Sequence, residues 1–233
     1  MKERVNSPFA FSGIEAVLFD LDGTLIDSAP DLGSAANKMR TKRGLHPLPQ
    51  AHYRPFVGLG ARGMIFVAFK LEPCDDRFDE LTKEFLSNYQ VGLRQLTELF
   101  PGVQQMVDVI VLSGLKWGVV TNKAVRFTAP LTQMMLLFKS AGVVVSGDST
   151  PHSKPHPAPL LFAASQLGIA SHKCVYVGDD ERDIVAGKAA GMQTVAAAYG
   201  YLGQDTDHRK WAADAMINTP LELLSLLKLR QMV

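Results

Sequence analysis

Two aspartates, Asp20 and Asp22, stand two residues apart directly after the apolar run Ala16–Phe19. One carboxylate of such a pair can attack phosphorus and form a covalent intermediate. The other can protonate the leaving oxygen and then deprotonate the water that hydrolyses the intermediate. Gly23 follows, and glycine permits a tight turn that brings backbone N–H groups near a bound anion. The alternative is an ordinary surface turn, where Asp-Gly pairs are common.

Two further motifs offer groups that bind an anion. Thr121 and Asn122 follow the apolar run Trp117–Val120, and a hydroxyl with the next backbone N–H can hold phosphate oxygens. Lys154 is held in an extended segment by the prolines of Lys154–Pro157. Its ammonium can stabilise a nucleophilic carboxylate and a phosphoryl group. Each motif alone is a weak signal, because strand ends often begin turns and most lysines are exposed.

A fourth motif adds an acidic cluster after the apolar run Cys174–Val177. Asp179 at the end of that run can be a magnesium ligand, and Asp183 lies one helical turn further on. The alternative is that these acids decorate a helix N-terminus. Taken with the other motifs, a phosphate and several carboxylates cannot share a pocket without cations. Lys154 and a magnesium ion supply that compensation.

The elements that must position these residues are short apolar runs separated by helical lengths. Such runs indicate strands of a parallel sheet that is covered on both faces, and therefore an α/β fold. They are Ala16–Phe19, Trp117–Val120, Val143–Val145, Cys174–Val177, Thr194–Ala198 and, near the end of the chain, Asp214–Ile217. Ligands bind such sheets outside the carboxyl ends of the strands. The polar residues at those ends are Asp20, Thr121, Ser146 and Asp179.

Between residues 29 and 100 the pattern changes to helical periodicity without clear strands. Pro101–Gly102 then marks the return to the sheet. We therefore predict a core domain of residues 1–28 and 101–233, with a helical cap domain of residues 29–100 inserted after the first strand.

Composition limits the partners of the chain. The 233 residues are 47% hydrophobic and 20% charged with a formal net charge of +1, so no broad field favours nucleic acid or an anionic membrane. No apolar run approaches the length that spans a bilayer, and none near the N-terminus suits export. The two cysteines, Cys74 and Cys174, lack the spacing of a metal site. We expect a cytoplasmic protein, monomeric or homodimeric, that acts on a small molecule.

The four motifs, in this order, resemble those of the haloacid dehalogenase superfamily, in its phosphatase branch with a helical cap after the first motif. The resemblance covers nearly the whole chain and implies a Rossmann-like core and Mg2+ as the cofactor. It implies that Asp20 is the nucleophile, Asp22 the general acid and base, and Lys154 the group that steadies Asp20. Asp20, the backbone carbonyl of Asp22, and Asp179 would hold the metal.

The same resemblance gives roles to the remaining motif residues. Thr121 and Asn122, with the turn at Gly23, would bind the phosphate. Asp183 would orient the motif lysine or a metal-bound water, and Asp180 would support the site. Asp180 stands where many members of the superfamily carry Ser or Thr.

Within the superfamily, the chain is similar to two groups of phosphatases. The segments that resemble phosphoglycolate phosphatases are Asp20–Asp31, Thr121–Lys123, Val144–Ser149 and Lys154–Leu161. Those that resemble N-acetylmuramic acid 6-phosphate phosphatases are Trp117–Phe127, Val177–Gly191 and Tyr199–Leu202. We expect hydrolysis of 2-phosphoglycolate, with N-acetylmuramic acid 6-phosphate or a sugar-phosphate mutase reaction as alternatives. Two other functions fit the sequence less well. Dehalogenase chemistry does not call for a general acid and base such as Asp22, and a signalling receiver module phosphorylated on aspartate has no use for an inserted cap.

The predicted cap contains a segment, Val57–Gly63, that resembles the substrate-specificity loop of such caps. Because an arginine fork matches a carboxylate, we hypothesise that Arg62 contacts a carboxylate of the substrate. The alternative is a solvated arginine at a helix start.

Overall fold

The centre of the molecule is a six-stranded sheet in which all neighbouring strands are parallel, in the order β5-β4-β1-β6-β7-β8. The computed structural model describes residues 11–203 and 207–227; residues 1–10, 204–206 and 228–233 of the predicted core domain lie outside them. The strands are β1 (Ala16–Phe19), β4 (Lys116–Val120), β5 (Val143–Val145), β6 (Cys174–Gly178), β7 (Gln193–Ala197) and β8 (Ala215–Ile217). Each predicted run forms a strand, and the predicted α/β fold class is confirmed.

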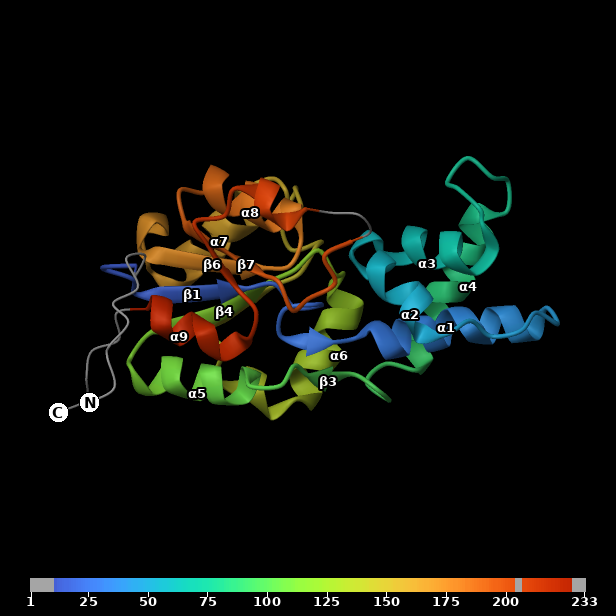
Figure 1. Ribbon diagram of the computed structural model, residues 1–233, viewed down its shortest axis with the longest axis horizontal. Coiled ribbons are helices and arrows are strands. Elements are labelled where there is room, and N and C mark those ends of the chain that lie inside the picture. Colours follow the sequence, from blue (N-terminus) through green and yellow to red (C-terminus); the bar gives the residue numbers. More distant parts are fainter. Residues whose placement is uncertain (1–10, 204–206, 228–233) are drawn as a thin grey trace.

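Both faces of the sheet are buried beneath helices (Figure 1). Alternate residues of β1 point to opposite faces, so that Val17 and Phe19 join one hydrophobic core while Ala16 and Leu18 join the other. The covering helices are α5 (Val103–Leu112), α6 (Val125–Met134), α7 (Ala158–Leu167), α8 (Glu181–Ala189) and the short α9 (Leu223–Leu226). Burial on two sides explains why these strands are apolar throughout and do not alternate with polar residues.

The parallel register places the motif residues at one edge of the sheet. Phe19 at the end of β1 lies opposite Val119 of β4 and Val177 of β6. Asp20 and Asp179 therefore follow the carboxyl ends of two neighbouring strands, β1 and β6, and lie at the same edge of the sheet. This is the edge at which parallel α/β sheets bind their ligands.

Residues 29–91, which lie between β1 and β4 in the chain, form a group of helices beyond that edge (Figure 1). They are α1 (Ala29–Lys42), α2 (Gln50–Tyr53), η1 (Arg54–Leu59), α3 (Gly60–Phe69) and α4 (Phe78–Val91). Leu81, Phe85 and Tyr89 share one face of α4 and are buried among the helices. The assignment of separate core and cap domains stays a prediction. Within the described ranges, no helix is long and apolar enough to cross a membrane.

The two chain segments that connect this helical group to the sheet pair with each other. Ile26–Asp27 forms β2 and Glu98–Leu99 forms β3, joined as an antiparallel ribbon. The buried Asp31 carboxylate accepts hydrogen bonds from the backbone N–H groups of Leu96 and Thr97 at 2.9 and 3.0 Å. The sequence shows no clear strand between residues 29 and 100, and the structure adds the short β3 there. A strand of two residues is too short to show periodicity in the sequence.

Candidate active site

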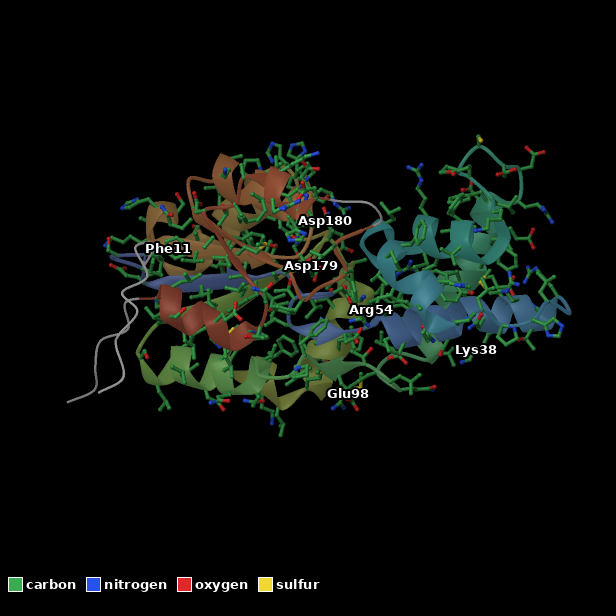
Figure 2. All side chains as sticks on the ribbon, viewed as in Figure 1. Phe11, Lys38, Arg54, Glu98, Asp179 and Asp180 are labelled. Atoms are coloured by element: carbon green, nitrogen blue, oxygen red, sulfur yellow. The ribbon has the colours of Figure 1, made fainter. Side chains whose placement is uncertain are left out.

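Three predicted site residues meet at the edge of the sheet. One carboxylate oxygen from each of Asp20, Asp179 and Asp183 lies within 4.8 Å of the others. They come from the end of β1, the end of β6 and the first turn of α8. Figure 2 shows Asp179 at the end of the sheet that faces the helices α1–α4.

Lys154 lies inside this acidic cluster. Its ammonium is 2.7 Å from Asp183 Oδ1 and 2.9 Å from Asp20 Oδ1, and it also donates a hydrogen bond to the Tyr176 hydroxyl at 2.8 Å. The lysine is 4% exposed. Burial alone lowers its pKa, but the carboxylates of Asp183 and Asp20 outweigh burial and raise it. Lys154 is therefore a permanent cation in the site.

One ammonium does not balance three carboxylates, of which Asp179 and Asp183 are buried and Asp20 is partly buried. Burial, followed by the charges of Asp20 and Asp183, raises the pKa of Asp179 well above its usual range. Asp20 Oδ1 is buried, and although it is paired in charge with Lys154, it accepts no hydrogen bond with good angles from any described residue. Mg2+ prefers carboxylate oxygens such as these. The residues present thus fit a hard divalent cation.

Two glycines leave the space that Asp179 occupies. A Cβ on Gly23 would lie 2.1 Å from Asp179 Oδ2, and a Cβ on Gly200 would lie 2.3 Å from Asp179 Cβ. Gly23 also has a φ of +86°, which disfavours other residues. Its N–H donates to Ile26 O at 3.0 Å, and the binding of phosphate by the other N–H groups of this turn stays a prediction. The turn is closed by its own hydrogen bond, and the glycine admits the carboxylate of Asp179.

Tyr201 connects Asp179 to the start of the helical group and was missed by sequence reasoning. Its N–H donates to Asp179 Oδ2 at 2.9 Å, while its hydroxyl accepts from the N–H groups of Ser28 and Ala29 at 2.8 and 3.1 Å. The hydroxyl donates to Asp27 Oδ1 at 3.1 Å. No spacing rule signals this residue, because the partners of its hydroxyl stand more than 170 residues earlier.

Lys123 is the second residue that sequence reasoning missed. Its ammonium lies 2.9 Å from each oxygen of Asp22, and Ser28 Oγ donates to the same carboxylate. The lysine side chain is 9% exposed and lies 4.9 Å from the ring centroid of Tyr89 on α4. Burial alone lowers the pKa of Lys123, but Asp22 and Tyr89 together outweigh burial and raise it. The position of Lys123 directly after Thr121 and Asn122 was the sequence feature that could have identified it as a site residue.

Thr121 and Asn122 lie beside the other site residues, and Asn122 is hydrogen bonded to the backbone of Lys154. The Asn122 side chain accepts from the Lys154 N–H and donates to the Lys154 carbonyl, both at 2.9 Å. The buried Thr121 Oγ1 accepts from the Lys123 N–H at 3.2 Å. Both Thr121 and Asn122 line the same cavity as Lys154. Ser146, the remaining strand-end residue, is buried and does not line this cavity.

Asp180 joins the sheet edge to the helical group through Arg182. Its oxygens lie 2.8 Å from Nε and Nη2 of Arg182, whose Nη2 also donates to the Gly58 carbonyl. Burial alone raises the pKa of Asp180, but the hydrogen bonds from Arg182 outweigh burial and lower it. Asp180 also caps α8 in a reciprocal capping box with Asp183. Figure 2 shows Asp180 beside Asp179 at this edge.

A cavity of about 310 Å³ opens between the sheet edge and the helical group. It brings together Asp20, Asp22, Thr121, Asn122, Lys154, Asp179, Asp180 and Asp183. Arg62 is not among its lining residues; the guanidinium lies 3.5 Å from Glu72, and the side chain is 63% exposed. A larger hollow of about 990 Å³ among α1–α4 contains none of the predicted site residues. We therefore place the active site in the smaller cavity.

The chain is similar to known proteins in its sequence and in its fold. The family model described as haloacid dehalogenase-like hydrolase matches residues 17–197. A phosphoglycolate phosphatase of Xanthomonas campestris pv. campestris is 44% identical over 89% of this chain and 94% of the relative. An N-acetylmuramic acid 6-phosphate phosphatase of Pseudomonas aeruginosa is 41% identical over 92% and 95%, respectively. The crystal structure of a predicted phosphoglycolate phosphatase from Haemophilus somnus has a TM-score of 0.81 and 25% identity, over 93% of this chain and 99% of that one.

Proposed function

Because this chain belongs to the haloacid dehalogenase-like hydrolases, as a phosphatase of that superfamily, we propose that it hydrolyses small phosphate monoesters with magnesium and an aspartyl-phosphate intermediate. The observation that carries the proposal is the meeting of Asp20, Asp179 and Asp183 within 4.8 Å, with the Lys154 ammonium 2.9 Å from Asp20. A buried carboxylate beside cations can approach an anionic phosphorus centre, which an isolated carboxylate cannot.

In the first step, a carboxylate oxygen of Asp20 forms a bond to phosphorus while the bond from phosphorus to the ester oxygen breaks. Asp22 gives its proton to the departing oxygen, so that an alcohol leaves. Lys154 and the backbone N–H groups after Thr121 stabilise the charge on the transferring phosphoryl oxygens.

In the second step, a water oxygen bonds to phosphorus while the bond from phosphorus to Asp20 breaks. Asp22 takes the proton from this water and thereby returns to its starting form. Lys123, which contacts both oxygens of Asp22, holds this side chain in position to accept the proton. The products are inorganic phosphate and the restored Asp20 carboxylate.

Asp20, Asp179 and the backbone carbonyl of Asp22 would hold the magnesium ion, with Asp183 beside them and hydrogen bonded to Lys154. When bound, the ion supplies positive charge that offsets the crowded carboxylates and the phosphate. Tyr201, through its N–H, and Thr24, through its hydroxyl at 2.9 Å, orient Asp179 toward this role.

For the substrate, we propose a phosphate ester of an organic acid, with 2-phosphoglycolate first. The two relatives named above act, by their names, on phosphoglycolate and on N-acetylmuramic acid 6-phosphate. Both molecules carry a carboxylate. The 41% identity to the second relative makes N-acetylmuramic acid 6-phosphate the alternative, and kcat/KM measured for both esters separates the two.

The test of the reaction is hydrolysis of p-nitrophenyl phosphate by wild type and by Asp20→Asn, with Mg2+ and with EDTA. Removal of the nucleophile removes a whole step, so activity should fall by about three orders of magnitude or more. EDTA should abolish turnover, and added Mg2+ should restore it. Asp108→Asn, an exposed aspartate on α5, is the matched control and should retain full activity. Asp20→Asn activity within about tenfold of wild type would contradict the assignment.

A further inference from the structure

Arg126 is the basic side chain of the active-site cavity whose charge is not neutralised by any described carboxylate. Four basic residues line the cavity, and three of them, Lys123, Lys154 and Arg182, each pair with an aspartate of the site. Within residues 11–203 and 207–227, Arg126 forms neither an ion pair nor a hydrogen bond through its side chain. It is therefore the cation of this cavity that is free to bind an anionic group of a substrate.

Arg126 is an exposed residue that lines the cavity, and its guanidinium packs against an aromatic pair. It lies 4.6 Å from the ring centroid of Phe127, a buried residue whose ring is 5.2 Å from that of Tyr89 on α4. Stacking on a ring restricts the side chain while its N–H groups stay available at the edge. Arg126 also lies in the first turn of α6, where the helix dipole adds positive potential.

At the end of the cavity that holds Asp20, the cation is Lys154, which unlike Arg126 is paired with carboxylates. Lys154 is bonded to Asp20 and Asp183, so its charge is committed to the nucleophile and the metal cluster. An ester held there by its phosphate extends its organic part into the rest of the cavity, whose volume of about 310 Å³ accommodates a small molecule. Leu86 and Phe127 add apolar surface to this part. A carboxylate on the organic part needs a cation, and Arg126 is the one available.

We propose that Arg126 binds the carboxylate of the leaving group and is a specificity-determining residue for phosphate esters of organic acids. A planar guanidinium matches a carboxylate with two parallel hydrogen bonds. Arg126 thus takes the role that the sequence suggested for Arg62, which instead lies beside Glu72. The inference rests on the proposed phosphatase function.

The experiment compares Arg126→Gln with wild type on matched pairs of esters. 2-Phosphoglycolate is paired with ethyl phosphate, and N-acetylmuramic acid 6-phosphate with N-acetylglucosamine 6-phosphate, since the second member of each pair lacks the carboxylate. Loss of charged hydrogen bonds should lower kcat/KM by about ten- to a hundredfold for the better carboxylated ester, mainly through KM. For the partner ester that lacks the carboxylate, kcat/KM should change by less than about threefold.

Two further variants separate recognition from general damage. Arg126→Lys, which keeps the charge and loses the fork, should recover part of the activity on the carboxylated ester. Arg77→Gln changes an exposed arginine that does not line this cavity, and should change neither rate. Equal losses on both members of a pair, or no loss with Arg126→Gln, would overturn the role of Arg126. Wild-type turnover of p-nitrophenyl phosphate tests the phosphatase function separately, so the two failures are distinguishable.

Discussion

Replacement of Lys154 by methionine should both inactivate and destabilise the protein. The side chain keeps its approximate length but loses the ammonium, which lies 2.7 Å from Asp183 and 2.9 Å from Asp20. The Asp183 side chain is 1% exposed, so water cannot replace the lost partner. Removal of one member of a buried ion pair costs about 3–5 kcal/mol. This is a large part of the roughly 5–15 kcal/mol that stabilises a typical domain.

The pH dependence of this loss has a definite sign. Burial, despite Lys154, already raises the pKa of Asp183 to about 6, above its unfolded value. Without the ammonium this pKa rises further, so the folded variant binds a proton that the unfolded chain releases. A group with a raised folded pKa destabilises the fold at high pH, and the penalty fades as pH falls through that pKa. Lys154→Met should therefore lose less stability near pH 5.5 than near pH 8.

The assay is urea unfolding of wild type and variants in EDTA, followed by circular dichroism at both pH values. Lys173→Met is the matched control, because Lys173 pairs with Glu15 at 2.6 Å while both side chains are more than 40% exposed. Such exposed pairs contribute at most about 1 kcal/mol. The double variant Lys154→Met/Asp183→Asn should regain stability over Lys154→Met, since no unpaired charge then remains at position 183. Loss of less than about 1 kcal/mol in Lys154→Met at pH 8 would refute the reasoning.

Three other variants test the contacts around the cavity. Gly200→Ala should raise the Mg2+ concentration needed for half-maximal activity about tenfold or more, because the new Cβ would lie 2.3 Å from Asp179 Cβ. An unchanged dependence of activity on Mg2+ concentration would contradict this. Lys123→Met should lower kcat by about tenfold or more, since Asp22 loses the ammonium that lies 2.9 Å away. Rapid-quench kinetics of this variant should show accumulated phosphoenzyme. Absence of phosphoenzyme would count against a role of Lys123 in the second step. Arg182→Met should raise KM about two- to tenfold with little change in kcat, because the link from the sheet edge to the helical group is lost; an unaltered KM would contradict it.

Local pattern was sufficient to predict the architecture of the sheet. The apolar runs at Ala16–Phe19 and Cys174–Val177 became β1 and β6 because strands buried on both faces need side chains that are apolar throughout. Parallel strands end at a common edge, so the aspartates at positions 20 and 179 had to emerge together. The β2–β3 ribbon was not predictable, since two-residue strands have no period to detect.

The partners of individual side chains were beyond the reach of the sequence. Lys123 meets Asp22 across 101 residues of chain, and Tyr201 reaches Ser28 across 173. Neither pairing has a spacing that a motif could record. The surroundings of Arg62 and Arg126 were equally hidden, because each arginine stands at a helix start and only the packing around it differs.

The sequence by itself determined which residues end the strands, and hence that Asp20, Thr121 and Asp179 share one edge of the sheet. The tertiary structure decided which charges neutralise one another and which remain free. The physical reason is that residue order is a local property of the chain. Charge pairing depends on distances of about 3 Å between side chains, which are fixed only when the helical group and the sheet pack together.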